Sequence, residues 1–227
     1  MKNYIKKLTI FSSIITAGLF TTSSQAALYD RGNGMIFDDT LNITWLQDAD
    51  YAKTSGYDAD GKMSWSQAND WADGLVYDGY SDWRLPNIID LGNDGCNNDH
   101  AGGTDCGYNV ITSTSEMASL SYDTLGNLAI YDTSGNIPQP GYGVSNAGPF
   151  INIGESSYWS AQSNVASGNA AWSFSFHYGH QGPNFKHYEF NAWAVHDGDI
   201  AASAVPVPAA AWLFGSALVG LGLVRRK

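Results

Sequence analysis

The sequence predicts an α+β domain, and the periodicity of its apolar residues indicates this class. Apolar side chains first recur at helical spacing, from Trp65 to Leu75. From Trp172 onward they alternate with small polar side chains, as in a strand with one buried face. Helices that precede a small antiparallel sheet, rather than alternating with its strands, favour α+β over a parallel α/β design.

Turn and capping signals locate the first elements. Met35–Asp38 and Ile43–Leu46 are apolar runs around a four-residue turn, which predicts a short hairpin. Ser64 followed by Gln67 is a capping-box pattern, so a helix is expected to begin there and to end near Gly74.

Two further short helices are expected between residues 86 and 126. The first begins after Pro86 with Asn87 as its cap, and the second begins at Ser113, where Ser113 and Glu116 form another capping box. Gly126 ends the second helix. The buried sides would comprise Ile88, Ile89 and Leu91 in the first helix and Met117, Leu120 and Leu125 in the second.

The sheet is expected in the last part of the domain. Residues 172–177 form one strand, residues 178–186 make the turn, and residues 187–195 return as its partner. Residues 158–160 form a further short strand.

The N-terminus has the order of a secretory signal peptide over residues 1–27. Lys2, Lys6 and Lys7 precede an apolar stretch, and Ser24-Gln25-Ala26 fits the small-x-small cleavage pattern. The stretch is short for a membrane span, and the alternative is a buried N-terminal helix. We therefore expect export and removal of this segment by a signal peptidase.

The C-terminus combines a proline motif, an uncharged run over residues 209–224 and a basic end at residues 225–227. A C-terminal core helix would have a polar face, and this run has none. The segment resembles a PEP-CTERM sorting signal of the Val-Pro-x-Pro-Ala type, although Val207 stands where a Glu often lies. The matching motif residues are Val205, Pro206, Pro208 and Ala209. The resemblance implies a Gram-negative bacterium, a linker over residues 201–208, a transmembrane tail over residues 209–227, and processing by an exosortase-type protease.

Without its two ends the chain is strongly acidic. Residues 28–200 form the expected domain and contain five lysines and arginines against 22 carboxylates, a net charge near −17. Such a charge repels nucleic acid and anionic membranes and suits the binding of cations. The alternative is that the acidity serves solubility alone.

Cys96 and Cys106 are the two cysteines of the chain. An even number of cysteines in an exported protein favours a disulfide, which would stabilise the fold by about 2–3 kcal/mol. Metal binding by the two thiolates is the alternative, with His100 as the only nearby further ligand.

Oxygen ligands gather in and beside this cysteine loop, so calcium is the candidate cofactor. The candidate ligands are Asp90, Asp94, Asn97, Asp99 and Asp105. Turn-rich loops also favour Asn, Asp and Gly, which leaves a purely structural alternative. Weaker candidates for a metal are His177 with His180 and Glu189, and the acidic set Asp48, Asp50, Asp58 and Asp60.

The segment Tyr-Ser-Asp-Trp-Arg-Leu-Pro at residues 80–86, with SYWSA, AWSFSFHYG and NAWAVHDGD further on, resembles the Lcl C-terminal domain family over residues 30–199. The order of the Ser-Trp-x-x-Ala and Arg-Leu-Pro segments also resembles formylglycine-generating enzymes, which implies a C-type-lectin-like fold. Those enzymes use a late cysteine pair for copper, and this chain has no cysteine after Cys106. The resemblance therefore gives no catalytic residue.

The motif residues Trp83, Arg84, Leu85 and Pro86 are expected to be structural. Arg84 would pair with a carboxylate and stack on an aromatic ring, and so fix the loop in which it lies. The expected function is a non-enzymatic, exported binding module for a polysaccharide or a surface protein, outside the cell. The alternatives are an enzyme with a divergent metal-dependent site and a structural matrix protein.

Overall fold

The computed structural model describes residues 27–92 and 100–200. The expected linker and sorting tail, and all but the last residue of the expected signal peptide, lie outside these ranges. Within them, no helix is both long enough and apolar enough to cross a membrane.

The first sheet contains the predicted hairpin. Its strands are β1 (Leu28–Asp30), β2 (Met35–Asp38), β3 (Ile43–Leu46) and β10 (Val195–Asp197), antiparallel and in the order β1-β2-β3-β10. The bounds of β2 and β3 agree with the prediction. The turn between them is held by Asp38, whose carboxylate accepts the N–H groups of Thr40 and Leu41.

The second sheet has six strands in the order β4-β9-β6-β7-β8-β5. They are β4 (Lys62–Met63), β5 (Gly107–Tyr108), β6 (Ser157–Ser163), β7 (Ala170–Ser175), β8 (His180–Phe185) and β9 (Phe190–Asn191). All pairs are antiparallel except β6 with β9, so the sheet is mixed rather than purely antiparallel. β6 contains the predicted short strand.

The expectation of one buried face for β7 is wrong, because all six of its residues are buried. The serines on the second face are tolerated there because the sheet satisfies their hydroxyls. Ser173 Oγ donates to the carbonyl of Gly182 and accepts from Asn184 Nδ2.

The partner of β7 also differs from the prediction. Residues 180–185 were expected in a turn but form β8. Of the expected partner strand over residues 187–195, only Phe190 and Asn191 in β9 and Val195 in β10 are in strands, and these belong to different sheets. Gly182 and Pro183 are common turn residues, which explains the wrong prediction. Pro183 is tolerated because the outer neighbour β5 pairs only with His180 and Gln181.

The helix predicted from Ser64 is confirmed as α2 (Trp65–Asp73), which ends at Gly74. The N–H of Ser64 donates to Gln67 Oε1 at 3.1 Å, as a capping box requires. The side toward the core comprises Ala68, Trp71 and Ala72. A shorter helix, α1 (Tyr51–Thr54), was not predicted.

The prediction of a helix after Pro86 is wrong. Residues 87–91 are extended, and Ile88 is buried whereas Ile89 and Leu91 are exposed. Their backbone amides bond to a distant segment instead of to a helical turn. Asn87 N donates to Glu116 Oε2 at 2.7 Å, and Ile89 N donates to the carbonyl of Thr114 at 2.7 Å.

The next helical segment exists, but its α-helical part begins later than predicted. It comprises η1 (Thr112–Thr114), α3 (Glu116–Ala118) and the π-helical η2 (Ser119–Thr124). Ser115, not Ser113, caps α3, because Ser115 Oγ accepts the N–H of Ala118. The predicted capping box of Ser113 and Glu116 does not form, because the Glu116 carboxylate accepts hydrogen bonds from Arg84 and from the N–H of Asn87. The predicted buried residues Met117, Leu120 and Leu125 are buried, and Gly126 follows with φ of 69°.

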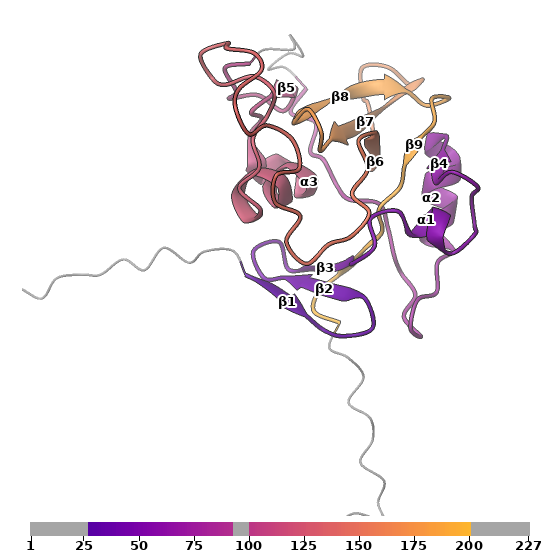
Figure 1. The fold of residues 1–227 in the computed structure, drawn as a ribbon. Coiled ribbons are helices and arrows are strands. Elements are labelled where there is room, and N and C mark those ends of the chain that lie inside the picture. The colour runs from indigo at the N-terminus through magenta and orange to yellow at the C-terminus, as the bar shows by residue number, and fades with distance from the viewer. Residues whose placement is uncertain (1–26, 93–99, 201–227) are drawn as a thin grey trace, which may run out of the picture.

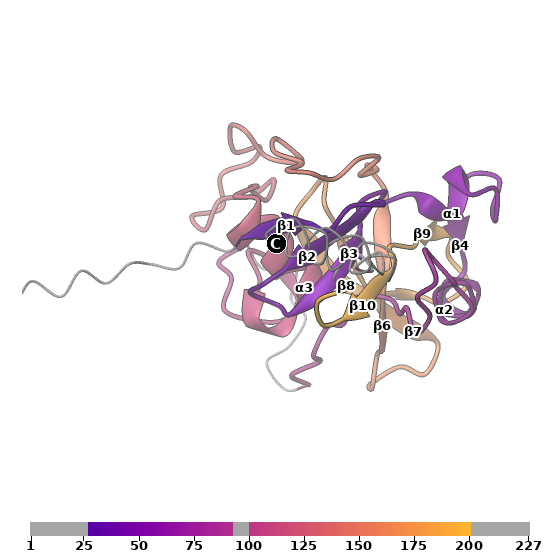
Figure 2. The same ribbon diagram turned by 90° about the horizontal axis from the view of Figure 1, so that it is seen from below.

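The two sheets share one aromatic core. Figures 1 and 2 show α1 and α2 on one side of the molecule and α3 on the other. Trp193 lies in the connection from β9 to β10 and contacts Trp45 of the first sheet and Tyr158 of the second. One antiparallel sheet and one mixed sheet, with few short helices, confirm the α+β class.

The buried carboxyl group of Asp38 makes stability depend on pH. Burial raises its pKa above the ordinary value of 3.8, although the N–H groups of Leu41 and Thr40 oppose this. At a pH just above 3.8, the native state therefore keeps a proton that the unfolded chain has released. The contribution of Asp38 to the free energy of unfolding then falls as the pH rises from about 3.8 upward. Asp38→Asn should remove this loss.

We expect Asp38→Asn to gain stability relative to the wild type between pH 3 and pH 7, as measured by urea unfolding at both values. Asp70→Asn, at an exposed position of α2, is the control and should show a smaller change. An equal change for both variants would contradict the assignment to Asp38.

Candidate functional site

The family-type motif at residues 80–86 lies against the first sheet. Trp83 and Leu85 are each 1% exposed, and Pro86 is buried. Between them, the N–H and the carbonyl of Arg84 both bond to Val195 of β10 at 2.8 Å. The alternation of buried and partly buried residues aims the Arg84 side chain away from the core.

Arg84 joins two carboxylates from distant parts of the chain. Its Nη1 and Nη2 donate to the two carboxylate oxygens of Glu116, each at 2.8 Å, in a bidentate pair. Its Nε and Nη2 donate to Asp197 Oδ1 at 2.9 and 2.6 Å. The expected stacking of Arg84 on an aromatic ring is not observed within the described part of the chain.

The two carboxylates beside Arg84 determine the pKa of its guanidinium. Burial alone lowers the pKa of the guanidinium, but the hydrogen bonds and charges of Glu116 and Asp197 outweigh burial, and the pKa rises. Arg84 is therefore a permanent cation that holds α3 and β10 in place.

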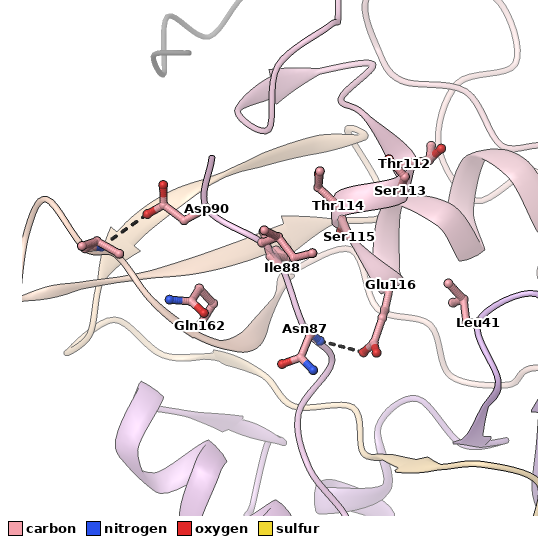
Figure 3. A pocket seen from close by; sticks show the side chains of 12 residues that line it. Leu41, Asn87, Ile88, Asp90, Thr112, Ser113, Thr114, Ser115, Glu116 and Gln162 are labelled. Carbon is pink, nitrogen blue, oxygen red and sulfur yellow. Dashed lines mark hydrogen bonds between the residues drawn. The ribbon is translucent and has the colours of Figure 1, made fainter. Parts of the chain in front are cut away.

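A groove of about 440 Å³ begins where the motif ends (Figure 3). This volume is within the range of small-ligand sites, roughly 300–1,000 Å³. The groove is bordered by the extended segment after Pro86, by η1 and the start of α3, and by β6 with the loop that follows it. Its lining residues are Leu41, Asn87, Ile88, Ile89, Asp90, Thr112, Ser113, Thr114, Ser115, Glu116, Gln162 and Val165.

The lining combines hydroxyl and amide groups with exposed apolar side chains. Ile89 and Val165 are 57% and 80% exposed. Both carboxylates are already engaged: Glu116 by Arg84 and by the N–H of Asn87, and Asp90 by the N–H of Val165 and by Trp172 Nε1. The dashed bonds in Figure 3 show how Asn87 and Asp90 are held. The groove thus suits a ligand with many hydroxyls and some apolar surface.

The family model described as the Lcl C-terminal domain matches residues 34–196. The chain belongs to the Lcl C-terminal domain family. No curated protein and no solved structure was found to match the chain. In this Lcl C-terminal domain, both the motif and the whole groove lie within the matched residues.

The candidate calcium ligands are only partly within the described residues. Asp94, Asn97 and Asp99 lie outside them. Asp90 accepts the bonds described above, and Asp105 is buried and accepts the N–H of Leu91. In residues 27–92 and 100–200, no group of three or more His, Cys, Asp or Glu side chains could hold a metal ion. The weaker candidate sets around His177 and Asp48 lie within these residues, so neither forms such a group. Calcium binding by the cysteine loop stays a prediction.

The predicted disulfide also involves a residue outside the described ranges. Cys106 is buried at 1% exposure, and no cysteine of the described residues is free. Cys96 lies outside them, so the bond between the two stays a prediction.

Sequence reasoning did not identify the groove. Residues 112–115 are four consecutive hydroxyl residues, of which Ser113 alone was expected to cap a helix. One cap needs one such side chain, and Ser115 provides it. The surplus of hydroxyl groups is the signal that could have indicated a binding surface here.

Proposed function

We propose that this Lcl C-terminal domain is an exported, non-enzymatic binding module whose groove recognises a neutral polysaccharide. The observation that carries the proposal is the lining of the groove, where the hydroxyl residues Thr112 and Ser113 and the amide residue Gln162 occur together with exposed Ile89 and Val165. Hydroxyl and amide groups match the hydroxyls of a sugar, and the aliphatic side chains match its C–H surfaces.

The charge of the domain supports a neutral ligand over an anionic one. The domain carries a net charge near −17, which repels acidic polysaccharides. Among the groove residues the carboxylates of Glu116 and Asp90 are held by protein donors, so they shape the wall of the groove. A surface protein is the alternative ligand.

The cellular address rests on the two ends of the sequence. The N-terminal pattern supports export by a signal peptide, and the resemblance of the C-terminus to a PEP-CTERM signal supports sorting by an exosortase-type protease in a Gram-negative envelope. The proposed location is the outer surface or the extracellular matrix. The C-type-lectin-like fold is proposed from the resemblance to formylglycine-generating enzymes, and the α+β class is in agreement with it.

Glycan arrays probed with the exported protein test the proposal, with calcium and with a chelator in parallel. We expect binding to neutral glycans, and Ser113→Trp should weaken it at least tenfold because the indole would fill the groove. Such a loss corresponds to about 1.4 kcal/mol. Ser66→Trp, at an exposed position of α2, is the matched control and should bind like the wild type.

Two outcomes would contradict the proposal. They are the absence of glycan binding by the wild type in both conditions, and unchanged binding by Ser113→Trp. Binding that is lost only with the chelator would support the calcium prediction for the cysteine loop. Binding of surface proteins without glycans would favour the alternative ligand.

A further inference from the structure

A second concavity lies on the other side of the loop that joins β6 to β7. Its volume is about 300 Å³, at the lower end of the range for small ligands. Its main lining residues are Asn164, Ser167, Pro183, Asn184, Phe185 and Tyr188, and no lining residue is charged. Val165 of the same loop lines the first groove, so the loop separates two adjoining sites.

Two aromatic rings form the apolar walls of this concavity. Phe185 and Tyr188 are 51% and 44% exposed. Their ring centroids are 5.8 Å apart, and the ring planes are perpendicular at 90°. His187 stacks on Phe185 with an interplanar angle of 20°, which supports the ring. Single exposed apolar residues are common, but two large rings that line one concavity are typical of recognition surfaces.

The backbone holds the rings in a fixed arrangement. Tyr188 N donates to the carbonyl of Phe185, and Lys186 between them bonds on both sides, its N–H to Asn169 and its carbonyl to the N–H of Trp65. Lys186 Nζ lies 4.2 Å from the centroid of the Trp65 ring. The ammonium group of Lys186 is thus directed onto Trp65. Because the backbone of this turn is already fixed, binding a ligand would cost little conformational entropy there.

Two amides provide polar groups at the edge of the rings. Asn184 Nδ2 donates to Ser173 Oγ at 2.9 Å, and Asn164 Oδ1 accepts the N–H of Ser167 at 2.8 Å. Within residues 27–92 and 100–200, the second amide atom of each has no hydrogen-bond partner. One acceptor and one donor are therefore available beside the rings, as neighbouring sugar hydroxyls require.

We infer that the Phe185–Tyr188 concavity is a second binding site, which stacks a pyranose ring of a neutral polysaccharide. The inference rests on the proposed function and extends it, because a polysaccharide that occupies the first groove can continue around the β6–β7 loop. Because the two rings are perpendicular, one sugar ring can lie against the face of Phe185 or of Tyr188, with the other ring beside it.

Affinity gel electrophoresis of the exported protein tests this site, with hydroxyethylcellulose, galactomannan and dextran as the probes. We expect at least one probe to retard the wild type, and the double variant Phe185→Ala with Tyr188→Ala to weaken that association at least tenfold. Phe185→Tyr keeps an aromatic ring and should retain binding. Tyr57→Ala removes another exposed ring, which is 59% exposed, and should also retain binding.

The outcomes separate this site from the proposed function. If no probe retards the wild type, recognition of neutral polysaccharide fails, and the second site fails with it. If Ser113→Trp loses binding while the double alanine variant binds like the wild type, the second site alone is overturned. Loss of binding by Phe185→Tyr or Tyr57→Ala to the same extent as by the double variant would also overturn it, since ring stacking would not be the cause.

Discussion

Trp193→Ala is expected to lower the free energy of unfolding by about 3–5 kcal/mol, the usual cost of truncating a buried aromatic side chain. Trp193 is fully buried where the two sheets meet. Its ring centroid lies 4.9 Å from that of Trp45 in β3, 5.5 Å from that of Phe176 and 5.9 Å from that of Tyr158 in β6. Its Nε1 donates to the carbonyl of Leu46 at 2.7 Å.

The loss should be large because the substitution affects both sheets together. An alanine would leave a cavity between them and an unpaired buried carbonyl at Leu46. Since domains are stable by roughly 5–15 kcal/mol, much of the stability would be lost. Urea unfolding measures the change.

Trp65→Ala is the matched control for Trp193→Ala, because Trp65 is only partly buried at the start of α2. Its loss should be smaller, although its Nε1 also donates to a carbonyl, that of Ser160. If Trp65→Ala lowers the free energy of unfolding as much as Trp193→Ala does, the packing of Trp193 between the two sheets makes no special contribution to stability.

Elements with local signals were predicted well from the sequence. The hairpin of β2 and β3 is fixed by its own turn, where Asp38 binds the N–H groups of Thr40 and Leu41. Helix α2 is fixed by Ser64 and Gln67, three residues apart. In both cases the residues that decide the structure are neighbours in the chain, so a pattern can show them.

Elements that depend on distant partners were not predicted. Residues 87–91 follow a proline and begin with a common capping residue, but Glu116 and Thr114 accept the hydrogen bonds of their backbone amides. The partners of Arg84 lie 32 and 113 residues away, and no spacing rule connects such positions. A carboxylate partner for Arg84 could be expected from its chemistry, but Glu116 and Asp197 could not be named. The groove was missed for the same reason, because four separate segments contribute to its walls.

Arg84→Ala is expected to lower the free energy of unfolding by about 2–4 kcal/mol. Removing one partner of a buried ion pair costs roughly 3–5 kcal/mol, and partial exposure reduces this here. The side chains of Arg84 and Glu116 are 24% and 16% exposed, so the bidentate pair is largely shielded, whereas Asp197 is 78% exposed. The principal cost is the Glu116 carboxylate that is left without its cation. Adding Glu116→Gln to the variant should therefore recover part of the loss.

Arg31→Ala is the control for this substitution, because Arg31 makes a similar bidentate pair with Asp199 at a more exposed position, 28% and 39%. Exposed pairs contribute about 0–1 kcal/mol, so this variant should lose less stability than Arg84→Ala, although Arg31 also lies 5.1 Å from the centroid of the Tyr29 ring. Urea unfolding of the three variants measures the difference. Equal costs for Arg84→Ala and Arg31→Ala would show that Arg84 is an ordinary surface residue.

The same substitution connects the family motif to the groove. Glu116 lines the groove and also holds Asn87 by its N–H, so Arg84 fixes two walls through one carboxylate. We expect Arg84→Ala to weaken the proposed glycan binding under conditions in which the variant is still folded. Among the residues that line the groove, Glu116 is the one to which the side chain of Arg84 donates hydrogen bonds. A loss of affinity would therefore identify it as a positioning residue, and full affinity in the folded variant would limit the motif to stability.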